Sequence, residues 1–167
     1  MNNILVSSQG TLSFHGQIYR CALGRGGVKA DKQEGDGATP LGSFAMRKVF
    51  YRPDKFTAPP VTKLPLEALE SNSGWSDDSA LPDYNCYVQL PYTGSHEQLW
   101  RADDLYDIIV VLAYNDAPVM LGKGSAIFMH IAREAYMPTD GCIALSQPDL
   151  LALLAEADAN TRVEIKL

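Results

Sequence analysis

The sequence predicts a mainly β domain with one or two short α-helices. Short apolar or alternating segments recur along the chain and are separated by turns rich in glycine and proline, a pattern typical of strands. Only one segment, near the C-terminus, carries a long apolar stripe with helical spacing. The 167 residues suffice for one buried core, so residues 1–167 are predicted to form a single domain of two sheets or one partly closed sheet.

The first fifty residues predict a β-hairpin, then glycine-rich loops and a longer strand. His15-Gly16 is a suitable tight turn for the hairpin. Two glycine-rich stretches, 24–27 and 35–37, are expected to form loops that border a cleft. Strands are expected at residues 4–7, 11–14, 17–22 and 43–50.

Residues 52–83 are predicted to form a long loop insertion. The composition shifts there to Pro, Ser, Asp and Gly, and only residues 66–70 suggest a short helix. An insertion of this length is typical of a lid or of the wall of a site.

The remaining strands and the main helix lie in the second half of the chain. Ser146 is a plausible N-cap, and Pro148 and Asp149 suit a first helical turn. The helix is expected to close near Asn160. Its apolar stripe consists of Leu150, Leu151, Leu153, Leu154 and Ala157. Strands are expected at residues 87–90, 107–112, 126–131 and 163–165.

Charge and composition exclude several classes of partner. The formal charge of −6 and a pI near 4.9 oppose binding to nucleic acid or to an anionic membrane surface. No apolar run approaches the roughly 20 residues that span a bilayer. Residues 1–10 show neither a basic leader nor a cleavage site, so we expect a cytoplasmic protein.

Neither a metal nor an organic cofactor is expected. The acidic pairs at 77–78 and 103–104 have no His or Cys at ligand spacing, which favours solvated faces over metal sites. The segment Gly24-Arg-Gly-Gly lacks the Lys-Ser/Thr ending of a phosphate-binding loop, which favours a plain turn.

Cys142 is the strongest candidate for a catalytic residue. The other two cysteines, Cys21 and Cys86, are distant in sequence, and an odd number of widely spaced cysteines fits no disulfide framework. His130 ends an apolar strand twelve positions earlier and could serve as the base that a thiol nucleophile needs. Gly141 lets the backbone turn so that amide N–H groups face a carbonyl oxygen. A buried structural thiol and a core histidine are the alternatives.

Two segments resemble the YkuD-type L,D-transpeptidase catalytic domain. The first runs from GKGSAIFMH, which ends at His130, to Gly141-Cys142, and the second is TPLGSF at residues 39–44. The resemblance implies the β-sandwich-like fold of that family and an activity on peptidoglycan stem peptides. It implies a thioester at an L-centre of diaminopimelate, loss of the terminal D-alanine, and transfer of the acyl group to an amine or to water.

The resemblance also implies residue roles. Cys142 matches the nucleophile, His130 the base, and the amides of Gly141 and Cys142 the oxyanion hole. Asp140 and Ala144 depart from the side chains usual in the family. A replacement cation for a substrate carboxylate is therefore sought among Arg25, Arg101 and Arg133.

Other residues are expected to contact the substrate. Thr139 and Asp140 adjoin the nucleophile, and Tyr136 lies in the loop between base and nucleophile. His96 and Glu97 form either a second part of the cleft or a solvated turn.

The sequence therefore predicts a cysteine-dependent L,D-carboxypeptidase that trims tetrapeptide stems in wall turnover or precursor metabolism. The first alternative is L,D-transpeptidation, by cross-linking or by D-amino acid exchange. The second is an inactive module that binds stem peptides. The sequence is silent on any protein partner.

Overall fold

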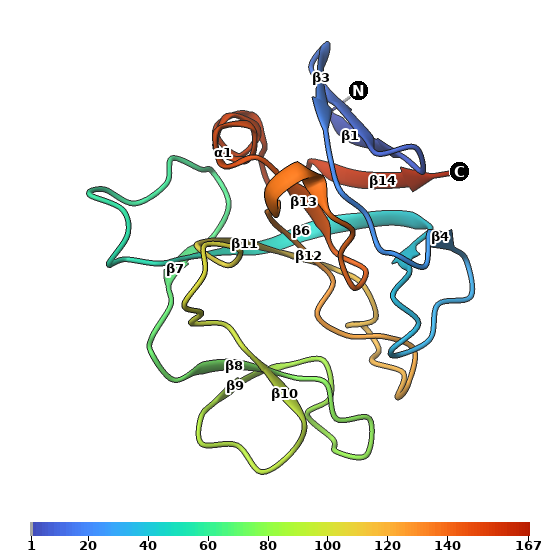
Figure 1. The fold of residues 1–167 in the computed structure, drawn as a ribbon, viewed down its shortest axis with the longest axis vertical. Coiled ribbons are helices and arrows are strands. Elements are labelled where there is room, and N and C mark those ends of the chain that lie inside the picture. Colours follow the sequence, from blue (N-terminus) through green and yellow to red (C-terminus); the bar gives the residue numbers. More distant parts are fainter. Residues whose placement is uncertain (1) are drawn as a thin grey trace.

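The structure, a computed structural model, describes residues 2–167 and confirms a mainly β fold with one α-helix (Figure 1). The strands of the first half are β1 (Asn3–Ser7), β2 (Thr11–Phe14), β3 (Gln17–Arg20), β4 (Val28–Lys29), β5 (Thr39–Pro40), β6 (Gly42–Tyr51), β7 (Leu66–Ala68) and β8 (Ser73–Ser76). The second half contains β9 (Tyr87–Gln89), β10 (His96–Gln98), β11 (Ile108–Leu112), β12 (Phe128–Ile131), the 3₁₀ helix η1 (Glu134–Tyr136), β13 (Ile143–Leu145), α1 (Gln147–Glu156) and β14 (Arg162–Lys166).

The large sheet is organised around β6. Its strand order is β13-β12-β11-β6-β14-β1-β2-β3, and β7 pairs in parallel with the end of β6. One half of β6 pairs with β14 and the other half with β11. A separate three-stranded sheet, β10-β8-β9, lies across from β11 and β12, below them in Figure 1.

The two faces of the large sheet bury two cores. Because side chains alternate along a strand, Met129 and Ile131 of β12 enter the core under α1, whereas Phe128 faces the small sheet. Trp75 of β8 packs edge to face on Phe128, with ring centroids 5.1 Å apart. This contact joins the two sheets.

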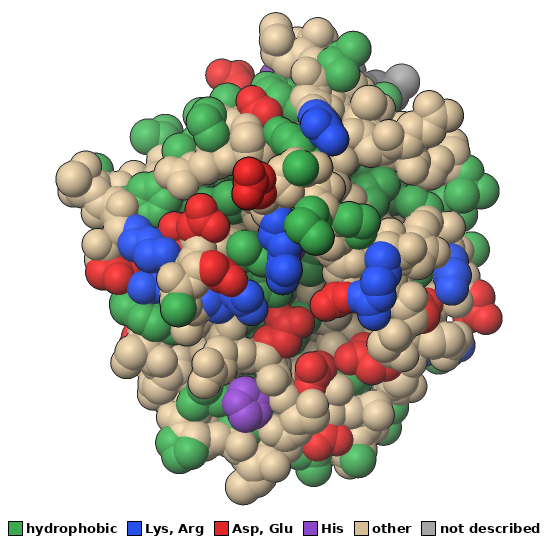
Figure 2. Space-filling model, viewed as in Figure 1, with side chains coloured by type: hydrophobic (Ala, Val, Ile, Leu, Met, Phe, Trp, Pro, Cys, Tyr) green, Lys and Arg blue, Asp and Glu red, His purple; other side chains and the backbone are tan. Residues whose placement is uncertain are grey.

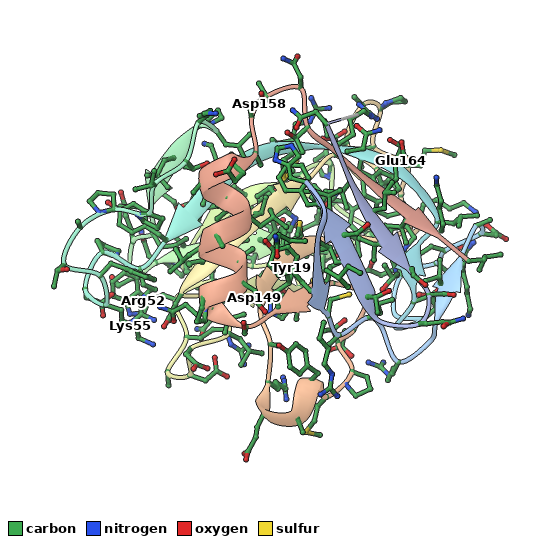
Figure 3. All side chains as sticks on the ribbon, turned by 90° about the horizontal axis from the view of Figure 1, so that it is seen from above. Tyr19, Arg52, Lys55, Asp149, Asp158 and Glu164 are labelled. Atoms are coloured by element: carbon green, nitrogen blue, oxygen red, sulfur yellow. The ribbon has the colours of Figure 1, made fainter. Side chains whose placement is uncertain are left out.

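The helix α1 confirms the predicted N-cap and apolar stripe. The Asp149 N–H donates to Ser146 Oγ over 3.3 Å, and Leu150, Leu153 and Leu154 are buried. Figure 3 shows α1 from above, across the strands, with Asp149 near one end. The helix stops at Glu156 rather than near Asn160, since Asp158 begins a turn in which its carboxylate accepts from the Asn160 N–H.

The predicted helix at residues 66–70 is wrong. Residues 66–68 form β7, because the segment extends along β6 and hydrogen bonds join it there, from Val49 N–H to Pro65 O and from Leu69 N–H to Tyr51 O, each 2.8 Å. Residues 52–83 also supply β8, so this segment is not wholly a loop.

Candidate active site

Cys142 and His130 come from adjacent strands. β12 and β13 run parallel with His130 opposite Ala144, and Cys142 immediately precedes β13. Cys142 packs in the core between the two sheets, and both side chains line one cleft. The structure thus brings together the two residues predicted to be catalytic.

The thiol of Cys142 is held by backbone groups. Its Sγ–H donates to Ala126 O over 3.2 Å, and the Phe128 N–H donates to Sγ over 3.4 Å. Ala126 has a positive φ of 53°, which is uncommon for a residue with a side chain. Asn85 fixes this conformation, because its Oδ1 accepts from the Ala126 N–H over 3.0 Å.

The imidazole of His130 is oriented by one hydrogen bond. Its Nδ1 lies 2.8 Å from Ile131 O, and since a carbonyl only accepts, Nδ1 carries the proton. The neutral ring therefore has Nε2 as its basic nitrogen. The ring also packs edge to face on Tyr106, with centroids 5.3 Å apart.

Burial keeps both groups neutral in the resting protein. Burial, with a smaller contribution from the nearby Glu97 carboxylate, raises the pKa of the Cys142 thiol to about 12. Burial lowers the pKa of His130 to about 4, with a smaller contribution in the same direction from Arg101 and Arg133. Attack by sulfur on a carbonyl must therefore be accompanied by proton transfer from Sγ to the imidazole.

The turn before Cys142 requires glycine. Gly141 has a φ of +136°, and a Cβ on it would lie 2.7 Å from Ala38 O. The Thr139 hydroxyl donates to Cys142 O over 2.6 Å and accepts from the Gly141 N–H over 3.1 Å. The Gly141 amide, which the resemblance assigns to the oxyanion hole, is thus engaged by Thr139 in the resting state.

The cleft has a volume of about 830 Å³ and is lined largely by polar groups. Asp77 comes from the predicted insertion, and Arg25, Gly35 and Gly37 come from the two glycine-rich loops, which confirms that those loops border a cleft. Figure 2 shows acidic and basic side chains intermixed around the hollow in the middle of this face.

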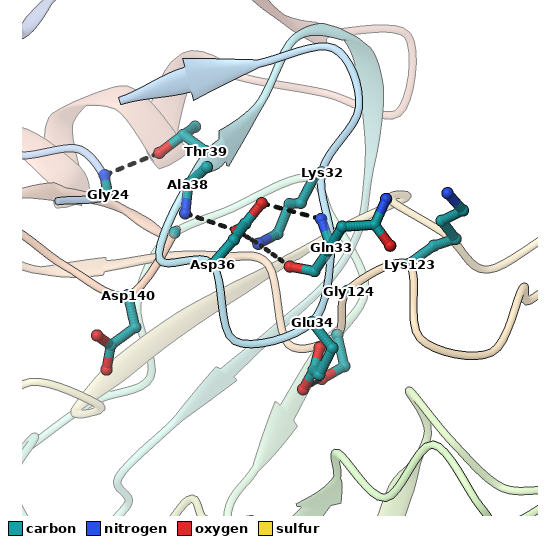
Figure 4. A network of polar contacts seen from close by, with 12 residues as sticks. Gly24, Lys32, Gln33, Glu34, Asp36, Ala38, Thr39, Lys123, Gly124 and Asp140 are labelled. Carbon is teal, nitrogen blue, oxygen red and sulfur yellow. Dashed lines mark hydrogen bonds and ion pairs between the residues drawn. The ribbon is translucent and has the colours of Figure 1, made fainter. Parts of the chain in front are cut away.

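Close backbone contacts and one ion pair hold the two glycine-rich loops. A Cβ on Gly24 would lie 2.2 Å from Gly37 O, so only glycine permits this approach. Lys32 Nζ contacts Asp36 Oδ1 over 2.8 Å, and the Asp36 carboxylate also accepts from the Gln33 and Ala38 N–H groups (Figure 4). These contacts lower the pKa of Asp36 to about 2, although burial opposes them.

Comparison with known families identifies the chain. The profile described as the L,D-transpeptidase catalytic domain (YkuD) matches residues 5–165. This chain belongs to that family. No curated protein matches it at a significant level.

Solved structures similar to the chain include two L,D-transpeptidases of Mycobacterium tuberculosis. L,D-transpeptidase 1 is 15% identical with a TM-score of 0.44, and the match covers 98% of this chain and 57% of that one. L,D-transpeptidase 3 is 14% identical with a TM-score of 0.47, and the match covers 99% of this chain and 60% of that one. The helical cell shape determining protein Pgp2 of Campylobacter jejuni is 16% identical with a TM-score of 0.48, and the match covers 98% of this chain and 46% of that one. The chain thus spans 46–60% of the length of these proteins.

Five of the seven residues predicted to bind substrate line the cleft of this L,D-transpeptidase domain. They are Arg25, Glu97, Arg133, Thr139 and Asp140. His96 is not among the lining residues: it precedes Glu97 on β10, so its side chain leaves the opposite face of the strand and packs on Tyr92. Tyr136 is also not a lining residue, because η1 places its ring under the guanidinium of Arg20, 4.5 Å away.

The three candidate arginines differ in their partners. Arg25 forms an ion pair with Asp140, and Arg101 makes two hydrogen bonds to Asp103, of 2.8 and 2.6 Å. Arg133 lines the cleft near His130 and is in no ion pair within residues 2–167. Arg133 is therefore the best placed of the three to bind a substrate carboxylate.

The start of the insertion is anchored beside the cleft. The Arg52 guanidinium stacks on Trp100 at 3.9 Å and donates to Arg101 O over 2.6 Å, and Lys55 Nζ contacts Asp107 over 2.8 Å. Figure 3 shows Arg52 and Lys55 together at one edge of the molecule.

Sequence reasoning missed Tyr106, Asn85 and Ala126. The only sequence signal for Asn85 is its position in a polar turn, where a buried role cannot be distinguished from an ordinary loop. Tyr106 is buried against His130 and Phe128, and nothing in the sequence around it indicates these contacts.

Residues 2–167 show no sign of a metal centre or of a membrane-spanning helix. They contain no group of three or more His, Cys, Asp and Glu side chains that could hold a metal ion. None of their helices has the length and apolar character needed to cross a membrane.

Proposed function

We propose that this chain is a cysteine-dependent acyl-transfer enzyme that acts on peptidoglycan stem peptides. Cys142 would form a thioester with the L-centre of diaminopimelate and release the terminal D-alanine. Membership of the L,D-transpeptidase family supports the substrate class. The observation that carries the mechanism is the position of Cys142 and His130 in one cleft, with the His130 Nδ1 fixed by Ile131 O.

The acylation step follows from the neutral state of both groups. As Sγ attacks the carbonyl carbon, its proton passes to His130 Nε2 and a negative charge develops on the carbonyl oxygen. His130 then gives this proton to the nitrogen of the leaving D-alanine, and the C–N bond breaks. General acid–base help of this kind contributes about 10²–10⁴-fold to a rate.

The fate of the acyl group defines two activities. Water as acceptor gives the L,D-carboxypeptidase predicted from the sequence, and an amine gives L,D-transpeptidation. Membership of the L,D-transpeptidase family supports the second activity. The cytoplasmic location and the role in turnover stay predictions.

The test is incubation of disaccharide-tetrapeptide with the wild type and Cys142→Ala, followed by mass spectrometry. We expect D-alanine release and an acyl-enzyme adduct on Cys142 in the wild type only. The variant should remain folded by circular dichroism, since Ala fits the space of Cys. Release of D-alanine by the folded variant, or none by the wild type, would contradict the proposal; the latter would favour the inactive binding module.

A further inference from the structure

Glu97 occupies the wall of the cleft opposite the catalytic pair. Glu97 lies opposite Trp75 in the pairing of β10 with β8, so the two side chains are on the same face of the small sheet. Because Trp75 packs against Phe128 of the large sheet, this face of the small sheet points toward the large sheet. Glu97, Cys142 and His130 all line this cleft. The charge of Glu97 raises the pKa values of Cys142 and Tyr106, in each case after the larger effect of burial.

One oxygen of Glu97 is fixed and the other is free. The Tyr106 hydroxyl donates to Glu97 Oε2 over 2.7 Å, and the Tyr106 ring packs against His130. No residue between 2 and 167 donates a hydrogen bond to Oε1. The carboxylate is therefore held in place while one oxygen remains available to a ligand.

The charge of Glu97 is not balanced by a cation of the protein. Around the cleft, Arg101, Lys32 and Arg25 each pair with another carboxylate, and Arg133 forms an ion pair with no carboxylate of residues 2–167, Glu97 included. Neither Glu97 nor Asp77 forms an ion pair within the described part of the chain. Asp77 also raises the pKa of Glu97, after the larger effect of burial, and its buried Oδ1 has no hydrogen-bond partner.

We propose that Glu97 binds the ammonium group of an amine acceptor and removes its proton before attack on the thioester, with Asp77 adding negative charge beside it. The inference rests on the proposed function and assigns an amine, rather than water, as the favoured acceptor. A fixed carboxylate without a cation partner, in the cleft that holds the nucleophile, matches a primary ammonium in both charge and hydrogen bonding.

The proposed step balances in protons and electrons. Glu97 takes one proton from the ammonium, and the free amine attacks the thioester carbonyl. The nitrogen of the tetrahedral adduct loses a second proton to His130 Nε2. The C–S bond then breaks, and its electron pair stays on sulfur, which recovers the proton from His130. The products are an amide, the Cys142 thiol and a protonated Glu97 that releases its proton to solvent.

The test measures how the acyl-enzyme partitions between two acceptors. Disaccharide-tetrapeptide serves as donor and methylamine as acceptor, and mass spectrometry quantifies tripeptide methylamide, free tripeptide and released D-alanine. Glu97→Gln removes the charge and keeps the shape, whereas Glu97→Asp keeps the charge. Glu67→Gln is a matched control, because Glu67 pairs with Lys48 outside this cleft.

We expect Glu97→Gln to lower the ratio of methylamide to free tripeptide at least about tenfold, as the loss of a hydrogen bond to a charged group implies. The ratio reports the acceptor step apart from the rate of D-alanine release; Glu97→Asp should recover part of it, and Glu67→Gln should leave it unchanged. An unchanged ratio in Glu97→Gln overturns the inference and leaves the proposed function intact. Loss of D-alanine release in Glu97→Gln assigns Glu97 to the donor step and also overturns the inference. No release by the wild type overturns the proposed function and this inference with it.

Discussion

At the scale of single residues, the burial of His130 makes stability depend on pH. Its pKa is about 4 in the folded chain and near 6.5 when unfolded, because the buried imidazole resists protonation. Below pH 6.5 the unfolded chain binds the extra proton and the folded chain does not. This contribution to stability is thus complete above about pH 6.5 and is lost as the pH falls toward 4, by about 3 kcal/mol in total.

We therefore expect His130→Gln to flatten the pH dependence of stability. Between pH 7 and pH 4, the free energy of unfolding should fall by about 2–3 kcal/mol less in the variant than in the wild type. Urea denaturation at a series of pH values measures the difference. His15→Gln is the control, because His15 is exposed. Parallel curves for the wild type and His130→Gln would show that His130 does not resist protonation.

At the scale of elements, the turn from η1 into β13 sets the direction of Cys142, the proposed nucleophile. Hydrogen bonds from the 22–25 segment hold this turn: Thr139 N–H donates to Leu23 O and Arg25 N–H donates to Thr139 O, each over 2.9 Å. Gly141 completes it with a backbone conformation that L-residues rarely adopt, beside the carbonyl of Ala38.

Gly141→Ala should cost both stability and activity. The positive φ alone costs of order 1–3 kcal/mol, and the contact with Ala38 O adds to it. Gly122→Ala is the matched control, since Gly122 also has a positive φ, of +78°, but a Cβ there meets nothing within 4 Å. Denaturant unfolding and D-alanine release should both decline more in Gly141→Ala than in Gly122→Ala. If the two variants lost stability and D-alanine release equally, the prediction would be contradicted, because the close contact at Gly141 would then have been relieved without moving Cys142.

At the scale of the whole molecule, the cleft exists because a small sheet faces a large one. The proposed catalytic pair belongs to the large sheet and Glu97 to the small sheet, so the packing between the sheets sets the distance between these groups. Trp75 is buried at this boundary, and its Nε1–H donates to Asn85 Oδ1 over 3.0 Å. Since Asn85 also fixes Ala126, this one contact connects the small sheet to the groups that hold the thiol.

Trp75→Ala should loosen the small sheet and misplace the thiol. Removal of a buried Trp side chain costs about 3–5 kcal/mol, because it leaves a cavity between the sheets. We expect a fall of that size in the free energy of unfolding, measured with denaturant, and slower D-alanine release from the molecules that remain folded. Ile18→Ala, which removes a side chain that is 76% exposed, should change neither quantity. If Trp75→Ala lowered the free energy of unfolding no more than Ile18→Ala does, the packing between the two sheets would not depend on Trp75.

The sequence by itself determined the fold class, the hairpin, the amphipathic helix and the candidate catalytic pair. Each rests on local information: alternation in residues 11–14, an N-cap at Ser146, and a histidine and Gly-Cys at a fixed separation. Only the tertiary structure decided that residues 66–68 are extended, that His96 and Tyr136 lie outside the cleft, and that Asn85, Tyr106 and Ala126 support the site. The physical reason is that each of these features depends on a partner far away in sequence. β7 is extended because it pairs with the edge of β6. The other residues are placed by groups from distant elements, such as the guanidinium over Tyr136 and the Glu97 carboxylate that accepts from Tyr106.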